Sequence, residues 1–118
     1  MGERGRWEVV NFRSTDGQLV AKRVVGLPGE VISLSEQRPV INGSIVPFPR
    51  QLEFLEYYAF GKLSRGREVS CGDGYFVLGD WSNDSADSRY DGPVPIDRIR
   101  GRAWLIVWPP SRFGFVGP

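Results

Sequence analysis

Short runs of apolar residues, separated by turn residues, recur along this chain. Residues 7–12 (WEVVNF) and 18–27 (QLVAKRVVGL) flank Asp16-Gly17, a dipeptide typical of tight hairpin turns. Residues 30–36 (EVISLSE) follow the turn dipeptide Pro28-Gly29 and alternate apolar with polar side chains, as a half-buried strand does. The pattern therefore predicts a hairpin followed by a third strand.

The later apolar runs extend this pattern. Asn42-Gly43 lies between β-branched residues within 39–48 (PVINGSIVPF), which is a strong hairpin signal. Residues 51–65 have helix-like spacing, but because they lack caps they are predicted to be irregular or a brief helix. Residues 74–80 (GYFVLGD) and 102–110 (RAWLIVWPP) are predicted as two further strands.

Length and composition narrow the fold class. At 118 residues with 41% hydrophobic residues, the chain suits one domain with a modest core. We therefore expect a single all-β domain over residues 1–118, either a small open barrel or a folded antiparallel sheet of short strands. No apolar run approaches the roughly 20 residues that a membrane span needs, so the chain as given is expected to be soluble or peripheral.

Charge and side-chain chemistry exclude several function classes. The formal net charge of +1 gives no broad electrostatic case for binding nucleic acid or anionic lipid. Histidine is absent, which excludes a Ser-His-Asp triad and histidine-based zinc sites. A single cysteine, Cys71, cannot close an internal disulfide. Any titrating catalytic group must therefore be Asp, Glu, Lys, Tyr or Cys71.

Residues 79–92 (GDWSNDSADSRYDG) concentrate short polar side chains directly after an apolar run. One interpretation is a polar surface turn, because these residue types are ordinary turn formers. A second is a calcium loop, since Asp80, Ser82, Asp84 and Asp91 fall at the first, third, fifth and twelfth positions. That interpretation fails because the sixth position lacks glycine and strands, rather than helices, are expected on both sides. The third interpretation is catalytic and depends on a lysine elsewhere.

Lys22 stands in the middle of an apolar strand. Because side chains alternate between the two faces of a strand, Lys22 and Arg23 must point to opposite sides. An ammonium group is costly to bury, so an enclosed lysine either pairs with a carboxylate or becomes neutral. A neutral lysine is a general base that can activate a serine without histidine. The alternative is an edge-strand lysine whose amine reaches solvent.

Three blocks of sequence occur together: 22–30 (KRVVGLPGE), 75–95 (YFVLGDWSNDSADSRYDGPVP) and 101–114 (GRAWLIVWPPSRFG). In order and spacing they resemble the type I signal peptidases, membrane-bound Ser/Lys proteases that remove signal peptides from exported proteins. The resemblance covers most of residues 8–116. It implies an all-β catalytic core, a lysine general base, and no metal or other cofactor. It also implies an enzyme at the outer face of a bacterial cytoplasmic membrane, whose partners are signal peptides of preproteins and the membrane surface, without nucleic acid.

The resemblance assigns roles to individual residues. Lys22 would be the base, and Ser85 would hold the Lys22 amine through a hydrogen bond, directly or through one water. Structural support of the site is implied for five residues: Arg23, Gly79, Asp80, Asp87 and Arg89. Within this set, Arg23 would pair with Asp80 and Asp87 with Arg89. Substrate binding is implied for four residues, of which the first three are equally compatible with an edge strand: Leu19, Val20, Ala21 and Ala86.

The family's nucleophile block does not occur in these 118 residues. In the family a Ser-Met-x-Pro block upstream of the lysine supplies the serine and the oxyanion donors, whereas residues 1–21 contain a single serine, Ser14, at the expected hairpin tip. A missing N-terminal segment or a second chain would have to supply the serine. Two alternatives stay open: a catalytically inactive paralogue that binds a peptide or partner, and a self-cleaving repressor, which the third block disfavours.

Aromatic residues gather near the C-terminus, at Trp104, Trp108, Phe113 and Phe115. Because amphipathic rings suit the headgroup region of a bilayer, part of this aromatic surface is expected to stay exposed. The alternative is that all four rings belong to the core.

Overall fold

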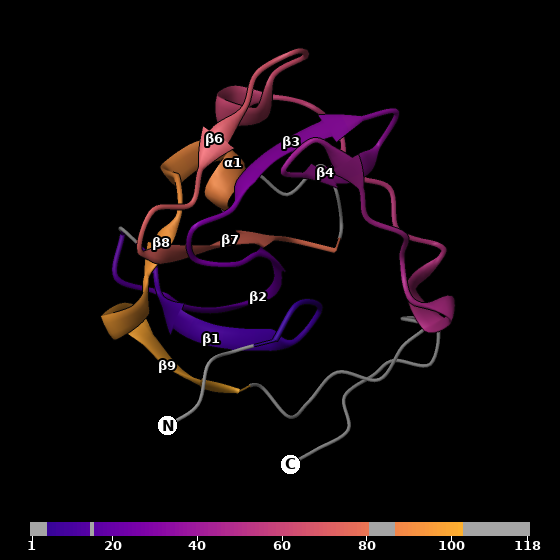
Figure 1. The fold of residues 1–118 in the computed structure, drawn as a ribbon. Coiled ribbons are helices and arrows are strands. Elements are labelled where there is room, and N and C mark those ends of the chain that lie inside the picture. Colours follow the sequence, from indigo (N-terminus) through magenta and orange to yellow (C-terminus); the bar gives the residue numbers. More distant parts are fainter. Residues whose placement is uncertain (1–4, 15, 81–86, 103–118) are drawn as a thin grey trace.

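The computed structural model describes residues 5–14, 16–80 and 87–102, which form two antiparallel sheets (Figure 1). Sheet A has five strands in the order β8-β7-β2-β1-β9, and sheet B has four in the order β5-β4-β3-β6. The strands are β1 Val9–Arg13, β2 Leu19–Gly26, β3 Val31–Ser35, β4 Arg38–Ile41, β5 Ser44–Ile45, β6 Val69–Ser70, β7 Gly74–Leu78, β8 Val94–Pro95 and β9 Ile99–Arg102. The all-β prediction of a folded antiparallel sheet of short strands is confirmed, and no ladder between the described strands closes either sheet into a barrel.

Sheet A begins with the predicted hairpin of β1 and β2. Their register pairs Val10 with Lys22 and Arg13 with Leu19. At the other end of the described chain, β8 and β9 are separated only by the 3₁₀ turn η3, Ile96–Arg98, yet they pair with opposite edges of the sheet. Since η3 spans from one edge to the other, sheet A folds back on itself.

Sheet B contains the second predicted hairpin. Asn42 and Gly43 join β4 to β5 with φ angles of 51° and 87°, the left-handed conformation that an Asn-Gly hairpin turn requires. The segment expected to be irregular or briefly helical contains the 3₁₀ turns η1, Arg50–Leu52, and η2, Gly61–Leu63. The prediction for that segment is confirmed.

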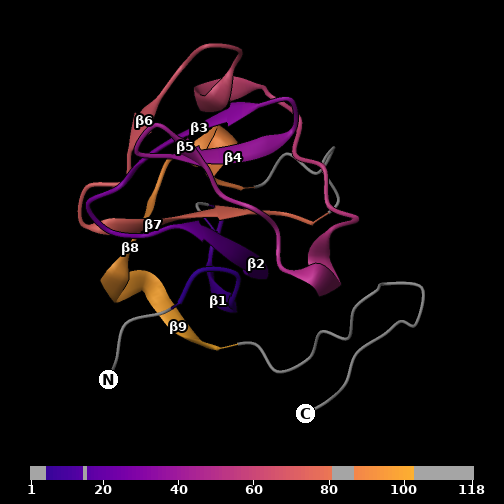
Figure 2. The ribbon, with the colours of Figure 1, turned by 45° about the vertical axis from the view of Figure 1, so that its right-hand side comes forward.

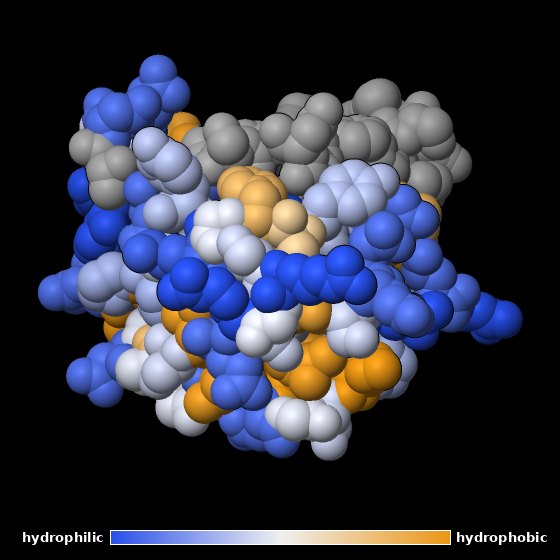
Figure 3. All heavy atoms as spheres, turned by 90° about the horizontal axis from the view of Figure 1, so that it is seen from above, coloured by the Kyte–Doolittle hydropathy of each residue, from blue (hydrophilic) through white to orange (hydrophobic). Residues whose placement is uncertain are grey.

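Each face of sheet A packs against a hydrophobic core. Figure 2 shows β3, β4 and β5 above β7, with β1, β2 and β9 below it. Val25 of β2 and Phe76 of β7 belong to the core between the sheets, while Val24 and Val77, their neighbours in sequence, belong to a second core on the opposite face. This alternation explains why all five residues of β7 are buried. From above, where sheet B lies, Figure 3 shows hydrophilic side chains crossing the face with apolar atoms between them.

Three features differ from the sequence prediction or go beyond it. Within the acidic loop, for which no element was predicted, Ser88–Asp91 form a single helical turn, α1, because the Asp87 side chain accepts a hydrogen bond from the Arg89 N–H as an N-cap. The strands β6 and β8 were not predicted, since each has two residues. The strand expected over 102–110 lies almost entirely outside the described residues, and β9 ends at its first position.

The turn between β3 and β4 provides a test of local strain. Gln37 has a φ of 67°, which costs a residue with a side chain roughly 1 kcal/mol but suits glycine. Gln37→Gly is therefore expected to raise the free energy of unfolding by about 0.5 kcal/mol in urea denaturation. The matched control, Gln51→Gly in η1, should lower it by a similar amount. A loss of stability at both positions would contradict the assignment of strain to Gln37.

Candidate functional site

Lys22 lies on the face of sheet A that carries the second core, the one that includes Val10, Val24 and Val77. Its lateral partner in β1 is Val10, and Val24 is the next residue of β2 on the same face; both valines are fully buried. Lys22 itself is only 8% exposed. Arg23 is also buried, but on the opposite face, so the predicted separation of the two cations is confirmed.

Gly79 lies on the other side of Lys22. The register of β2 with β7 pairs Arg23 with Leu78, so one further step places Gly79 beside Lys22. A glycine at this position adds no side chain to the face that Lys22 occupies. The Gly79 N–H points away from β2 and donates to Asp87 Oδ2 at 2.9 Å. Val10, Lys22, Gly79 and Asp87 therefore follow one another across the sheet.

Arg23 and Asp80 form an ion pair on the face opposite to Lys22. Arg23 Nη2 lies 2.7 Å from Asp80 Oδ2, and Arg23 Nε also donates to this carboxylate at 2.9 Å. The remaining guanidinium nitrogen, Nη1, donates to the Trp7 carbonyl at 2.8 Å. Asp80 also accepts a 3.4 Å hydrogen bond from the Tyr57 hydroxyl. The pairing expected from the resemblance is present, and it fixes the N-terminal end of the acidic loop.

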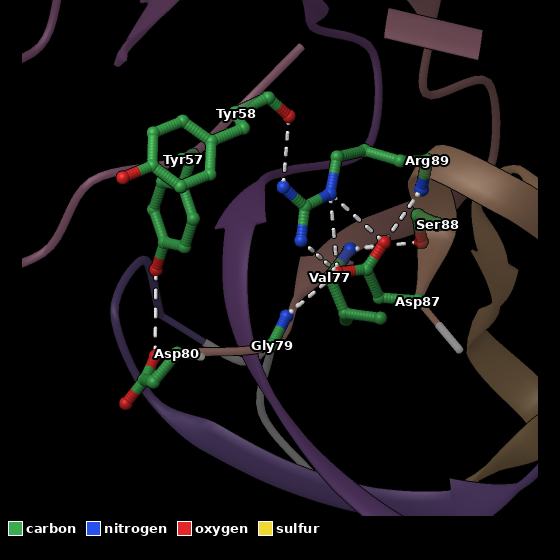
Figure 4. A network of polar contacts seen from close by, with 8 residues as sticks. All are labelled: Tyr57, Tyr58, Val77, Gly79, Asp80, Asp87, Ser88 and Arg89. Atoms are coloured by element: carbon green, nitrogen blue, oxygen red, sulfur yellow. Dashed lines mark hydrogen bonds and ion pairs between the residues drawn. The ribbon is translucent and has the colours of Figure 1, made fainter. Parts of the chain in front are cut away.

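Asp87 and Arg89 form a second, deeper ion pair at the other end of the loop (Figure 4). Arg89 Nη2 lies 2.5 Å from Asp87 Oδ2, and both side chains are 0% exposed. The Asp87 carboxylate also accepts hydrogen bonds from the N–H groups of Gly79 and Arg89. Because two backbone donors and a guanidinium surround it, this carboxylate is fully compensated despite its burial.

A backbone segment leading into η2 forms a cradle around Arg89. Arg89 Nη1 donates to the Tyr58 carbonyl at 2.9 Å, and the guanidinium carbon lies 4.6 Å from the centre of the Phe60 ring. Gly61 follows with a φ of 59°, and a Cβ there would lie 2.2 Å from the Arg89 carbonyl oxygen. Only glycine permits this approach, so the cradle and α1 must pack together as they do.

The side chains of Asp87 and Ser88 also complete the edge of β7. The strand β8 pairs with Gly74 and Tyr75 only. Farther along, Ser88 Oγ accepts a hydrogen bond from the Val77 N–H at 3.0 Å, and Asp87 accepts the one from Gly79. Two side chains thus replace the carbonyl groups of a longer strand, which leaves these buried donors satisfied.

Tyr57 touches both ion pairs. Its hydroxyl reaches Asp80, and its ring centre lies 5.8 Å from the Arg89 guanidinium carbon. Burial, followed by the nearby charge of Asp80, raises the pKa of Tyr57 well above its usual range, so the hydroxyl remains a donor. Sequence analysis missed this residue and Ser88. A lone tyrosine in an irregular segment carries no signal for such a contact, whereas the serine lay within the quoted acidic loop without being assigned a role.

Among the residues that the structure describes, the first half of β2 has an open edge on the side away from β1. The N–H of Val24 donates to the Glu8 carbonyl and its C=O accepts from the Trp7 N–H, both just before β1, so even-numbered residues of β2 direct their backbone groups toward β1. Leu19 and Ala21 must direct theirs to the other side. The pairing with β7 begins only at Arg23, and no described strand pairs with Leu19 or Ala21 on that side.

Two predicted site residues, Ser85 and Ala86, lie outside the described residues. Ser14 lies on the Lys22 face but four residues beyond Val10, about 13 Å along the strand, so it is not in contact with Lys22. Within the part of the chain that the structure describes, no three Asp, Glu or Cys side chains gather as metal ligands. The aromatic residues 104–115 also lie outside it.

Comparison with known proteins agrees with this geometry. The family described as "Signal peptidase, peptidase S26" matches residues 1–108. A signal peptidase I of Leptolyngbya laminosa is 38% identical over 97 residues, which cover 82% of this chain and 45% of that protein. A probable signal peptidase I-2 of Synechocystis is 33% identical over 97% of this chain and 52% of that protein. The chain therefore spans about half the length of these curated relatives.

A solved structure gives the same result for the fold. The crystal structure of a signal peptidase I from Enterococcus faecalis matches with a TM-score of 0.69 and 30% identity, covering 87% of this chain and 98% of that one. The two-sheet arrangement is thus shared by a protein of this kind.

The buried ion pair makes a quantitative prediction. Arg89→Ala leaves the Asp87 carboxylate buried and unpaired, so it is expected to lower the free energy of unfolding by about 3 kcal/mol or more. The matched control, Arg65→Ala at an exposed position, should change it by less than about 0.5 kcal/mol. Urea denaturation measures both, and equal effects of the two substitutions would show that the buried pair does not stabilise the fold.

Proposed function

The chain belongs to the signal peptidase S26 family, and on that premise we propose that it is the part of a signal peptidase I-type serine endopeptidase that carries the general base. Its 118 residues would be one domain, the C-terminal portion of the family's catalytic core. Its substrates would be the signal peptides of exported preproteins, at the outer face of a bacterial cytoplasmic membrane. No described helix is long and apolar enough to cross a membrane.

The observation that carries the proposal is the position of Lys22. It is buried in an apolar face of β2, directly after the open edge formed by Leu19 and Ala21. In the proposed reaction a neutral Lys22 amine removes the proton of a serine hydroxyl as the serine oxygen attacks the scissile carbonyl. The lysine then gives that proton to the departing amine, and a water molecule, activated in the same way, releases the acyl group.

Ser85 would support this base without adding charge. We propose that its hydroxyl accepts or donates a hydrogen bond at the Lys22 amine and so fixes the amine's direction. A carboxylate in the same place would favour the protonated lysine and abolish the base. The ion pairs of Asp80 with Arg23 and of Asp87 with Arg89 support this assignment, because each engages a carboxylate at an end of the loop that carries Ser85.

The substrate would bind as an added strand along β2. Leu19 and Ala21 offer backbone donors and acceptors on the side away from β1, as an extended peptide requires. Val20 lies between them and packs against the second core, on the Lys22 face of sheet A. Ala86 would lie beside a shallow pocket for a small side chain. This arrangement would place the peptide bond to be cut close to Lys22.

A second candidate function uses the same edge without catalysis. The family's nucleophile block does not occur in these 118 residues. The open edge of β2 supports this candidate, a β module that binds a peptide or a partner strand; a further segment or a second chain that supplies the serine would make the same edge part of an enzyme. Both functions predict strand addition, and they differ only in cleavage.

Strand addition predicts a two-residue period in an NMR titration. With a ¹⁵N-labelled chain and an extended peptide ending in Ala-x-Ala, the amide signals of Leu19 and Ala21 are expected to move, since their N–H groups face away from β1. The signals of Val20 and Lys22 should move less. A peptide with arginine in place of the final alanine is the control and should bind more weakly. Uniform shifts across all four residues would contradict an added strand.

Cleavage provides the second test. The chain alone is expected not to cut a preprotein in detergent, because loss of the nucleophile costs on the order of 10⁶ in rate. The same chain, extended at its N-terminus by a segment carrying a Ser-Met-x-Pro block, should cut it. In the extended chain Lys22→Arg should abolish cleavage, because a guanidinium keeps its proton.

The possible outcomes separate the two functions. An inactive extended chain that still binds the peptide would favour the binding module. Cleavage by the short chain at a rate near that of the extended one would identify a serine within these 118 residues as the nucleophile.

A further inference from the structure

An open groove at the end of sheet A is lined mainly by arginine. Its volume is about 520 Å³, and its lining residues are Arg13, Asp97, Arg98, Ile99 and Arg100. Three arginines and a single acidic residue thus line the groove, in a protein whose formal net charge is only +1. The groove is a local concentration of positive charge that the overall composition does not reveal.

The fold assembles this groove from two distant parts of the chain. Arg13 is the last residue of β1. Arg98 belongs to η3 and Arg100 to β9, the strand that pairs with β1 on the side away from β2. Arg98 Nη2 donates a hydrogen bond to the Arg13 carbonyl, and Arg13 Nη1 donates to the Gly17 carbonyl at 2.8 Å. These contacts hold the two segments side by side near the β1–β2 hairpin, at the left of Figure 1.

Exposed aliphatic side chains flank the arginines. Leu19 pairs directly with Arg13 in the β1–β2 register and is 59% exposed. Ile96 begins η3, two residues before Arg98, and is 51% exposed. Large aliphatic side chains left in solvent beside cations make a surface that is both apolar and positively charged.

We propose that this arginine groove and its aliphatic rim bind the anionic phospholipid headgroups of a bilayer. Guanidinium groups bind phosphate through paired hydrogen bonds, and their charge attracts an anionic surface. The two aliphatic side chains add the apolar contact that a free phosphate ion could not use. A lipid surface therefore fits both chemistries of this face.

The position of the groove connects it with the open edge of β2. Leu19 is both the rim residue beside Arg13 and the first residue of that edge. Contact with a bilayer through the groove would hold the edge close to the lipid surface, where a peptide segment leaves the membrane. The choice of a bilayer as occupant rests on the proposed function, but vesicle binding can be measured without any substrate.

The test compares two triple variants that change the charge equally. One variant carries Arg13→Gln, Arg98→Gln and Arg100→Gln in the groove. The control carries Arg38→Gln, Arg65→Gln and Arg67→Gln, three exposed positions outside the groove. Both are compared with the unchanged chain by co-sedimentation with phosphatidylcholine vesicles containing 30% phosphatidylglycerol, after thermal melting has shown that each variant is folded.

The expected result is a difference between the two variants. Each arginine near an anionic surface raises the partition coefficient about fivefold, so the groove variant should bind roughly 100-fold more weakly than the unchanged chain. The control variant should lose much less, and Ile96→Ser should weaken binding with no change in charge. Binding of the unchanged chain should fall as salt screens the surface.

Three outcomes would overturn the proposal. Equal losses in the two triple variants would show a response to net charge alone. No binding of the unchanged chain to anionic vesicles would show that the face does not dock on lipid. Displacement by millimolar inorganic phosphate at constant ionic strength would make the groove a small-anion site. None of these results depends on peptide binding or cleavage, so they leave the proposed function to its own tests.

Discussion

The complete burial of the Arg89 guanidinium is the constraint on which the structure around the acidic loop depends. A charge removed from water must be paired, and here Asp87 and the Tyr58 carbonyl accept hydrogen bonds from the three guanidinium nitrogens. The Phe60 ring covers one face, and Gly61 allows the backbone of α1 to approach. The end of β7, α1 and the chain before η2 are therefore held in one arrangement by a single side chain.

A buried arginine is paired with a carboxylate on sheet A as well, and this ion pair lies on the face opposite to Lys22. Arg23 and Lys22 are adjacent in sequence but point to opposite faces, and Arg23 reaches Asp80 on the face that Lys22 does not share. Gly79, which follows from the register as the neighbour of Lys22, contributes no side chain. Lys22 thus shares its face with the buried Val10 and Val24, while the carboxylates at both ends of the loop are engaged by arginines.

The short length of several strands also has consequences for function. Because β7 pairs with β2 only from Arg23 onward, no described strand covers the first half of β2 on the side away from β1. Because β8 and β9 are joined by the short η3 turn, Arg98 of that turn and Arg100 of β9 are brought beside the end of β1. This edge of β2 and the positively charged groove thus lie at neighbouring positions, since Leu19 pairs with Arg13.

The sequence by itself determined the elements whose signals are local. Asn42-Gly43 and Asp16-Gly17 specify turns through the conformations that their residues favour, and the alternation along β2 places Lys22 and Arg23 on opposite faces. Family resemblance added the two ion pairs, both of which are present. Only the tertiary structure decided which core encloses Lys22, that Tyr57 contacts both ion pairs, and that Arg13 meets Arg98. Those contacts join residues far apart in the chain, and no local pattern encodes them, because each depends on how two sheets pack and where a short strand ends.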